Sequence, residues 1–208
     1  CTRKKIVLIF DECTSGFRET FGGLHKKYNV LPDLCIFGKA LGNGYPITAI
    51  IGKKNIMQSA QSTFISSTFW TERTGYVAAL KTLEEMEKKK SWKKICNLGK
   101  MIKKQWIKSA KKHNIKINVT GLDAIPSFSI NSKEWIKYKS YFTYIMLKNK
   151  ILASNYIFLS TSHNKKNLKK YFKVLDQIFM TISQFELKNG LEKLRKIPEC
   201  HVGFKRLN

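Results

Sequence analysis

Short apolar runs that stop abruptly at charged residues or glycines limit the folds open to this chain more than any other feature. Residues 5–10 read KIVLIF and stop at Asp11, while residues 34–37 read LCIF and stop at Gly38. A third run, ITAIIG, covers residues 47–52. Unbroken apolar runs of this length are typical of parallel strands buried on both faces. We therefore predict an α/β layered fold in which these runs are strands.

Helical periodicity follows the strands. Apolar residues recur at helical spacing over residues 74–90 and along a second helix for which Ser91 can serve as the N-cap. The apolar positions of the two helices are Val77, Leu80, Leu83 and Met86, then Trp92, Ile95, Leu98, Ile102 and Trp106. The lysine-rich segment 88–94 lies between the two sets, and we place a domain boundary there.

Helices and strands alternate beyond this boundary. The remaining predicted elements are strands at 115–119, 126–130 and 156–160 and helices at 134–149 and 165–187. We therefore expect one domain over residues 1–90, a smaller α+β domain over residues 91–187, and a tail of little periodicity over residues 188–208.

The formal net charge of +25 raises the possibility of nucleic-acid or membrane-surface binding. Only 5 of the 39 basic residues are arginine, however, and recognition of phosphates and bases favours the bidentate fork of arginine. The lysines are also spread over the predicted helices. We attribute the charge to a compositional bias and expect no specific nucleic-acid partner. No apolar run reaches the roughly 20 residues of a membrane span, so none is expected.

The cysteines and histidines suggest a cytoplasmic protein and give no sign of a metal site. Five cysteines, an odd number without CxxC spacing, suggest reduced thiols in a cytoplasmic protein. The four histidines show no metal-ligand spacing, so we expect no metal site. The chain begins at Cys1 rather than Met, with a predicted strand almost at once, and we expect it to be a fragment that lacks an N-terminal part.

Asp11 and Lys39 stand where two of the predicted strands end. Ligands of open α/β sheets bind beyond the carboxyl ends of strands, so both charges would face one crevice if the strands are neighbours. A surface salt bridge would also explain the pair, but it contributes only about 0 to 1 kcal/mol. A lysine that forms a Schiff base and a carboxylate that keeps a pyridine nitrogen protonated suit pyridoxal phosphate. Gly38, Gly42 and Gly44 would let the backbone approach the flat ring of that cofactor.

Three segments in combination resemble the class III aminotransferases. They read LIFDECTSGFR at residues 8–18, PDLCIFGKALGNGYPITAIIG at 32–52 and STFWTERTGYVAALKTLE at 67–84. Within this group the chain is most similar to glutamate-1-semialdehyde 2,1-aminomutase and its aminotransferase-like relatives, over residues 5–185. The resemblance implies the aspartate-aminotransferase-like fold, fold type I of the PLP-dependent transferases. The first domain would then be the C-terminal part of the large, cofactor-binding domain.

Four residues receive roles from this resemblance. It implies that Lys39 is the Schiff-base lysine and that Asp11 is the partner of the pyridine nitrogen. Cys13 stands where the family usually has a valine that packs on the cofactor ring. Thr68 matches a threonine that binds the cofactor phosphate across the interface of a homodimer, so the active sites would be shared. The implied substrates are a small-molecule amino donor and acceptor.

Two departures from the family pattern leave the reaction open. After the threonine the family often has a small-Gly-x-Pro turn, whereas this chain has Thr71-Glu72-Arg73. No acidic residue occurs in residues 153–158, where true mutases carry one. Ordinary transamination is therefore as well supported as intramolecular amino transfer. The alternatives are an aminotransferase for another acceptor, for example in sugar or envelope biosynthesis, or a basic nucleic-acid-binding module of similar fold.

Overall fold

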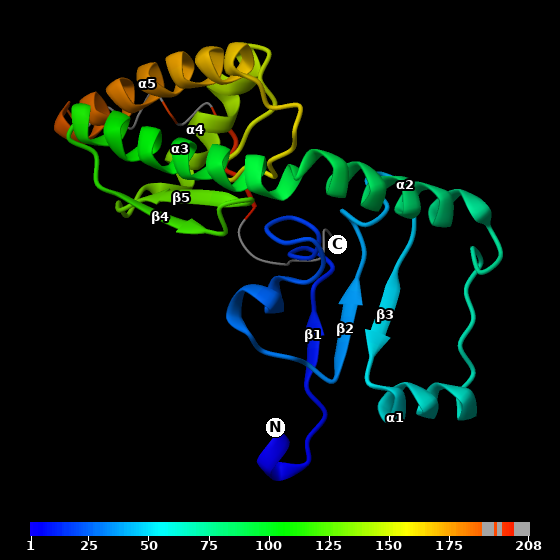
Figure 1. Ribbon diagram of the computed structural model, residues 1–208. Coiled ribbons are helices and arrows are strands. Elements are labelled where there is room, and N and C mark those ends of the chain that lie inside the picture. Colours follow the sequence, from blue (N-terminus) through cyan, green and yellow to red (C-terminus); the bar gives the residue numbers. More distant parts are fainter. Residues whose placement is uncertain (189–193, 195–196, 202–208) are drawn as a thin grey trace. The chain divides into compact units, whose positions relative to one another are not determined.

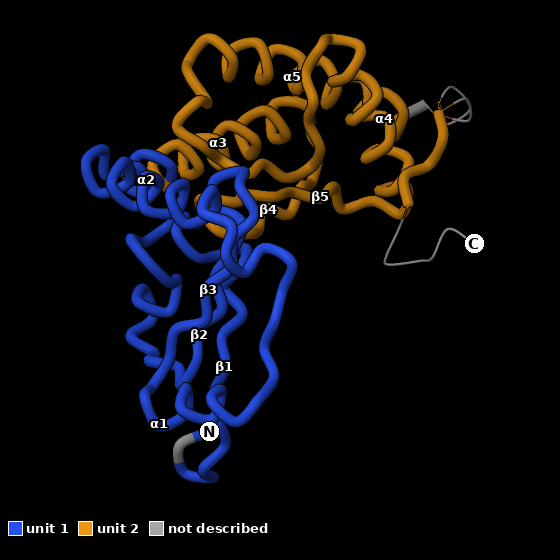
Figure 2. Tube along the Cα trace, turned by 90° about the vertical axis from the view of Figure 1, so that its right-hand side faces the viewer, with its two compact units in different colours: residues 1–95 blue, residues 96–208 orange. Residues whose placement is uncertain are grey.

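The computed structural model describes residues 1–188, 194 and 197–201. The chain separates into two compact units, residues 1–95 and residues 96–208 (Figure 2). Most of the expected tail, residues 188–208, lies outside the described residues.

The first unit contains a three-stranded sheet (Figure 1). Strand β1 (Ile9–Asp11) pairs in parallel with β2 (Leu34–Phe37), which pairs antiparallel with β3 (Ala49–Gly52). All three strands fall within or next to the apolar runs that predicted them. The parallel pairing of β1 and β2 confirms that the strands ending near Asp11 and Lys39 are neighbours.

The predicted burial of the first strand on both faces is wrong for this chain. Ile6, Val7 and Ile9 are exposed, and so are Ile50 and Ile51 on the opposite edge strand β3. Nothing else among the described residues covers these side chains, and β1 and β3 each have a neighbouring strand on one side only.

Helices of the first unit frame this sheet. The short elements are η1 (Thr2–Lys4), η2 (Leu24–Tyr28), α1 (Lys54–Met57) and η3 (Gln58–Ser62). The predicted helix over 74–90 is α2 (Arg73–Lys89), and its Ala79 and Leu83 pack against Cys35 and Phe37.

The apolar stripe predicted for α2 is only partly right. Val77 and Leu80 are 62% and 69% exposed, whereas Gly75 is buried. A Cβ at Gly75 would lie 2.5 Å from the carbonyl oxygen of Pro46. The small residues Gly75 and Ala79 therefore form the face that approaches the rest of the unit, and the larger apolar residues point elsewhere.

The second unit builds its core around one hairpin. Its elements are α3 (Ser91–Lys112, which starts in the first unit), β4 (Ile117–Gly121), β5 (Pro126–Ile130), α4 (Trp135–Lys148) and α5 (Lys165–Lys188). Strands β4 and β5 pair antiparallel. Phe128 of β5 contacts the rings of Trp106 on α3, Phe142 on α4 and Phe179 on α5. The three helices therefore cover the same face of β5 (Figure 1).

The predicted strand at residues 156–160 does not form. Only an isolated bridge joins Tyr156 to Ser127. Backbone amides of Ile157 and Leu159 still donate to the carbonyls of Pro126 and Ala124, at 3.1 Å each. The segment thus runs beside β5 with a few backbone hydrogen bonds but without a regular ladder.

Lysines occupy the exposed face of the long helix α3. Its buried face holds Ile102, Trp106 and Ala110, while Lys100, Lys104 and their lysine neighbours face solvent. Helix α3 is therefore amphipathic because it covers a core.

Among the residues that the structure describes, no helix combines the length and the hydropathy that a bilayer crossing requires.

A carboxylate on α5 ties the second unit together. Asp176 accepts hydrogen bonds from Ser109 at 2.8 Å, from Lys112 at 2.7 Å and from His113 at 3.0 Å. Burial acts to raise the pKa of Asp176, but the hydrogen bonds from Lys112, Ser109 and His113 outweigh it and lower the pKa to about 2.

Asp176→Asn is expected to lower the free energy of unfolding by about 1 kcal/mol at pH 7, since the carboxylate is a third exposed and solvent screens its partners. The carboxyl group takes up a proton more readily in the unfolded chain than in the folded one. Its stabilisation is therefore complete above the ordinary pKa of 3.8 and disappears as the pH falls towards about 2. Urea unfolding of wild type and variant between pH 7 and pH 2 measures this. A difference that does not narrow below pH 4 would contradict it, and Glu87→Gln, an exposed change on α2, serves as the control.

Candidate functional site

Asp11 and Lys39 come together at the carboxyl ends of β1 and β2. Asp11 is the last residue of β1 and pairs in register with Ile36 of β2. Lys39 comes two residues after Phe37, the last residue of β2, so Asp11 and Lys39 lie at the same end of the two parallel strands. The hydrogen bonds that Asp11 receives from Cys13 lower the pKa of the Asp11 carboxyl, and the positive charge of Lys39 lowers it further. Asp11 and Lys39 therefore interact electrostatically at the same end of the sheet. Both side chains are exposed, whereas the apolar runs that precede them predicted buried strands.

Lys39 has an unusual backbone. Its φ is +41°, a left-handed conformation that costs a side-chain-bearing residue about 1 to 2 kcal/mol. The following turn holds it there, since the amide of Leu41 donates to Gly38 and the amide of Asn43 donates to Lys39. The amine Nζ of Lys39 donates a hydrogen bond to Oγ1 of Thr14. Seven other non-glycine residues of the described chain also have positive φ, Lys90 at the C-cap of α2 among them, so this conformation by itself does not mark a functional residue.

Thr14 is a contact of Lys39 that the sequence reasoning missed. Its hydroxyl accepts from Lys39, and its carbonyl accepts from Nε of Arg18 at 2.6 Å. Burial lowers the pKa of the Arg18 guanidinium. The only signal in the sequence was that Thr14 lies within the motif that begins at Asp11.

Cys13 contacts Asp11 and senses the charge of Lys39. Its amide donates to Oδ1 of Asp11 at 3.0 Å. Burial, followed by the hydrogen bond and charge of Asp11, raises the pKa of the Cys13 thiol, so the sulfur stays protonated. A Cβ on Gly38 would lie 3.5 Å from Sγ of Cys13, which is ordinary van der Waals contact.

The glycines after Lys39 have reasons within the turn itself. A Cβ on Gly42 would lie 2.1 Å from the carbonyl oxygen of Tyr45. Gly44 has φ of +111°, which disfavours any side chain. These two glycines are therefore required to form the turn, whether or not a flat ring approaches it.

Thr68 lies outside the motif that contains Asp11 and Cys13 and outside the turn that contains Lys39. It lies in an exposed turn, residues 68–71, between η3 and α2. Among the described residues it makes no hydrogen bond with Asp11, Cys13 or Lys39. A threonine that serves a neighbouring chain's site would have this placement.

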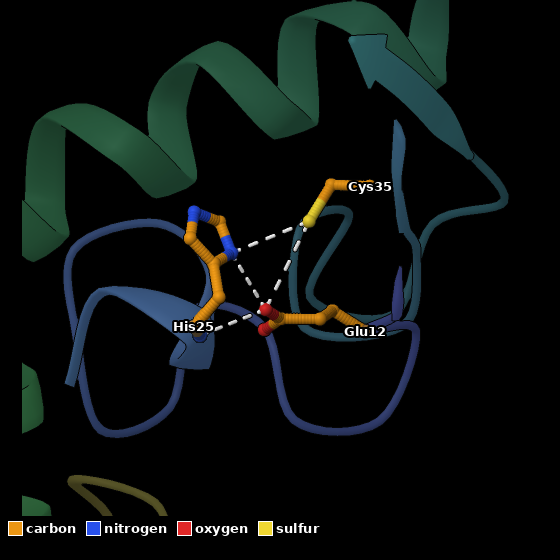
Figure 3. A group of neighbouring side chains, drawn as sticks. All are labelled: Glu12, His25 and Cys35. Atoms are coloured by element: carbon orange, nitrogen blue, oxygen red, sulfur yellow. Dashed lines mark hydrogen bonds and ion pairs between the residues drawn. The ribbon is translucent and has the colours of Figure 1, made fainter. Parts of the chain in front are cut away.

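A second group of side chains in the same unit was missed from the sequence. Glu12, His25 and Cys35 come together although 12 and 9 residues separate them along the chain (Figure 3). Burial, together with the charge and hydrogen bonding of Glu12, raises the pKa of the Cys35 thiol to about 11. Irregular spacing of this kind gives no metal-ligand pattern, so only the folded chain reveals the cluster.

Comparison with known sequences gives a family match over most of the chain. The sequence model described as "Aminotransferase class-III" matches residues 1–183. A 3-aminobutyryl-CoA aminotransferase of Cloacimonas acidaminovorans is 37% identical over 148 residues, which cover 69% of this chain and 36% of that protein. A glutamate-1-semialdehyde 2,1-aminomutase of Methanosphaera stadtmanae is 31% identical over 192 residues, covering 82% of this chain and 44% of that protein.

Solved structures show the same fold. The PLP internal aldimine form of the FumI protein of Sphingopyxis sp. MTA144 superposes with a TM-score of 0.82 at 21% identity, covering 90% of this chain and 46% of that one. An omega-transaminase from Sphaerobacter thermophilus gives a TM-score of 0.76 at 20% identity, covering 88% of this chain and 46% of that one. The chain thus spans less than half the length of these relatives.

Proposed function

Since this chain belongs to the class-III aminotransferases, we propose that the complete protein transfers amino groups between small molecules with pyridoxal phosphate as its cofactor. The observation that carries this proposal is the position of Asp11 and Lys39 at the same end of two neighbouring parallel strands, where the charge of Lys39 acts on the Asp11 carboxyl. A nucleic-acid-binding module of similar fold is not favoured, because the family match covers nearly all of the described chain.

The residues present fit pyridoxal phosphate. This cofactor, used throughout the class, withdraws electrons from the carbon that bears the substrate's amino group. Lys39 would hold it covalently through Nζ, and Asp11 would face the ring nitrogen. The acid already lies within electrostatic reach of the amine, as the lowered pKa of Asp11 indicates. Cys13, which contacts Asp11, would pack on the ring.

Lys39 would also move protons. Its amine is a general base and acid once released from the cofactor, provided that it is held close to the substrate carbon. The hydroxyl of Thr14 accepts from this amine, and Arg18 holds the carbonyl of Thr14. We propose that Thr14 gives the released amine a resting position beside the substrate carbon.

Asp11 would keep a proton on the ring nitrogen. An anionic carboxylate favours the protonated form of a nitrogen next to it. Its hydrogen bond from the Cys13 amide and the charge of Lys39 both favour the ionised carboxylate, so Asp11 would carry the negative charge that this role requires.

We propose that the protein is a cytoplasmic homodimer with shared active sites. Thr68 would bind the cofactor phosphate of the neighbouring chain, which agrees with its place in an exposed turn. Residues 1–90 would belong to the C-terminal part of the large domain and residues 91–187 would form the small domain. The five free thiols agree with a reducing compartment.

Two reactions use this machinery. Intermolecular transamination is supported by the 3-aminobutyryl-CoA aminotransferase relative and by the absence of an acid in residues 153–158. Intramolecular amino transfer is supported by the relatives described as glutamate-1-semialdehyde 2,1-aminomutases. A separate amino donor is required only for the first, so dependence of turnover on an added donor distinguishes them.

Borohydride reduction of the complete protein with its cofactor is expected to label Lys39. Reduction makes the bond between lysine and cofactor permanent, and peptide mapping then identifies the residue. The labelled peptide should contain the sequence GKALGNG. A label on Lys53 or any other lysine would contradict the assignment, and the absence of any label would contradict the proposed cofactor.

A further inference from the structure

Glu12, His25 and Cys35 place three electron-pair donor atoms at one point (Figure 3). Nδ1 of His25 lies 2.8 Å from Oε1 of Glu12 and 3.3 Å from Sγ of Cys35. Sγ and Oε1 are 3.9 Å apart. Glu12 and Cys35 are 3% and 4% exposed, and the side chain of His25 is 13% exposed. These residues lie on the end of β1, on η2 and on β2.

Hydrogen bonds can satisfy these three atoms without a metal, but the bond from the Cys35 thiol to Glu12 is long. Nδ1 of a neutral imidazole either donates or accepts one hydrogen bond. If Nδ1 donates to Glu12, the thiol of Cys35 is left with a carboxylate oxygen 3.9 Å away. If Nδ1 accepts from the thiol, its lone pair faces a carboxylate oxygen at 2.8 Å. A divalent cation would be bound by all three atoms at once.

The spacing of the three atoms fits tetrahedral zinc. Zinc bonds of about 2.3 Å to sulfur, 2.0 to 2.1 Å to nitrogen and 2.0 Å to oxygen place such ligands about 3.3 to 3.6 Å apart. The observed separations of 2.8, 3.3 and 3.9 Å differ from these values by about 0.5 Å or less. We propose that Glu12, His25 and Cys35 form a binding site for Zn²⁺ or a transition metal of similar preference.

The surroundings of the cluster hold the carboxylate in place. The amides of Leu24 and His25 donate to Glu12, as does the hydroxyl of Ser15 at 3.4 Å. A pocket of about 270 Å³ is lined by Glu12, His25, Ser15 and Tyr28 among others. This pocket gives the ion a route in and leaves room for water as the fourth ligand.

The charges balance when the metal binds. The thiol of Cys35 gives its proton to solvent and becomes a thiolate, Glu12 is already ionised, and His25 coordinates through Nδ1 with its proton on Nε2. Two negative ligands and one neutral ligand then surround a doubly charged ion. A buried site with no net charge avoids most of the cost of desolvating an isolated ion.

Zinc binding by the complete protein tests the site. After treatment with a chelator, the protein is loaded with zinc chloride and desalted. One zinc per chain is expected to remain, and X-ray absorption should show a single sulfur ligand at about 2.3 Å. Cys35→Ser should remove the sulfur signal, and Cys35→Ser and His25→Gln should each weaken zinc affinity at least about 100-fold, as loss of a direct ligand exceeds loss of a supporting contact.

Matched controls separate this site from other thiols. Cys200→Ser removes a half-buried thiol in the other unit and should leave both readouts unchanged. Zinc should also raise the thermal unfolding temperature of wild type but not of His25→Gln, which retains a side chain of similar size and shows whether the fold survives. No retained zinc in wild type, or a sulfur ligand that persists in Cys35→Ser, would overturn the proposal.

Discussion

Asp11→Asn is expected to slow amino transfer by the complete protein about 10²- to 10³-fold while leaving the cofactor attached. Asparagine keeps the shape of the side chain and can still accept the hydrogen bond from the Cys13 amide. It lacks the charge that would keep the ring nitrogen protonated. Removing one group that stabilises charge developing in a transition state typically slows a reaction about 10²- to 10³-fold, and the expected loss follows from this range.

Two measurements check the role of Asp11. Single-turnover half-reactions give the rate, and the visible absorbance of the cofactor shows whether Lys39 still holds it. The expected variant is coloured and nearly inactive. Glu84→Gln, which removes an exposed carboxylate on α2, is the control and should react at the wild-type rate. A half-reaction rate near that of wild type in Asp11→Asn would refute the proposed role.

Lys39→Ala and Thr68→Ala proteins are expected to regain activity when they are mixed. Lys39→Ala should lose about 10²- to 10⁴-fold or more in rate, because the proton-transferring amine is gone. Thr68→Ala should weaken cofactor binding about 10- to 100-fold, the effect of one hydrogen bond to a charged group. If Thr68 serves the neighbouring chain, one site of each mixed dimer contains both intact residues.

The size of the recovery follows from symmetry. Random exchange puts half of the dimers in the mixed form, each with one intact site of two, so about a quarter of the wild-type activity should return at limiting cofactor. Lys39→Ala mixed with inactive Asp11→Asn provides the contrast, because both residues belong to the same chain's site and either mixed-dimer site lacks one of them. No recovery despite proven subunit exchange would mean that Thr68 acts within its own chain.

The sequence predicted where the strands end more accurately than it predicted which of their side chains are buried. The runs that end at Asp11 and near Lys39 are strands, and their parallel pairing brings the two residues together. Short apolar runs carry this information locally. The exposure of Ile9 and Ile50 depends on which other segments cover the sheet, and the periodicity of the sequence does not encode this. Val77 and Leu80 were predicted on the apolar stripe of α2 but are exposed. The small residues Gly75 and Ala79 let α2 approach the rest of the unit more closely than larger side chains would.

The remaining differences arise from contacts between distant residues. The segment 156–160 has the composition of a strand, but its pairing with β5 is limited to an isolated bridge and a few amide bonds. Glu12, His25 and Cys35 belong to three different elements, and their meeting depends on the path of the chain through η2. Thr14 contacts Lys39 only because the two strand ends are adjacent. None of these contacts leaves a periodic signal in the sequence.

The catalytic role proposed for Lys39 conflicts with the stability of its left-handed backbone. Glycine would occupy φ of +41° without a steric penalty, whereas lysine carries about 1 to 2 kcal/mol of conformational cost at that position. A variant that no longer needs catalytic activity would therefore become more heat-resistant if Lys39 were replaced by glycine or asparagine. Directed evolution for heat tolerance alone should therefore favour loss of this lysine, and a screen that also demands turnover is needed to retain it.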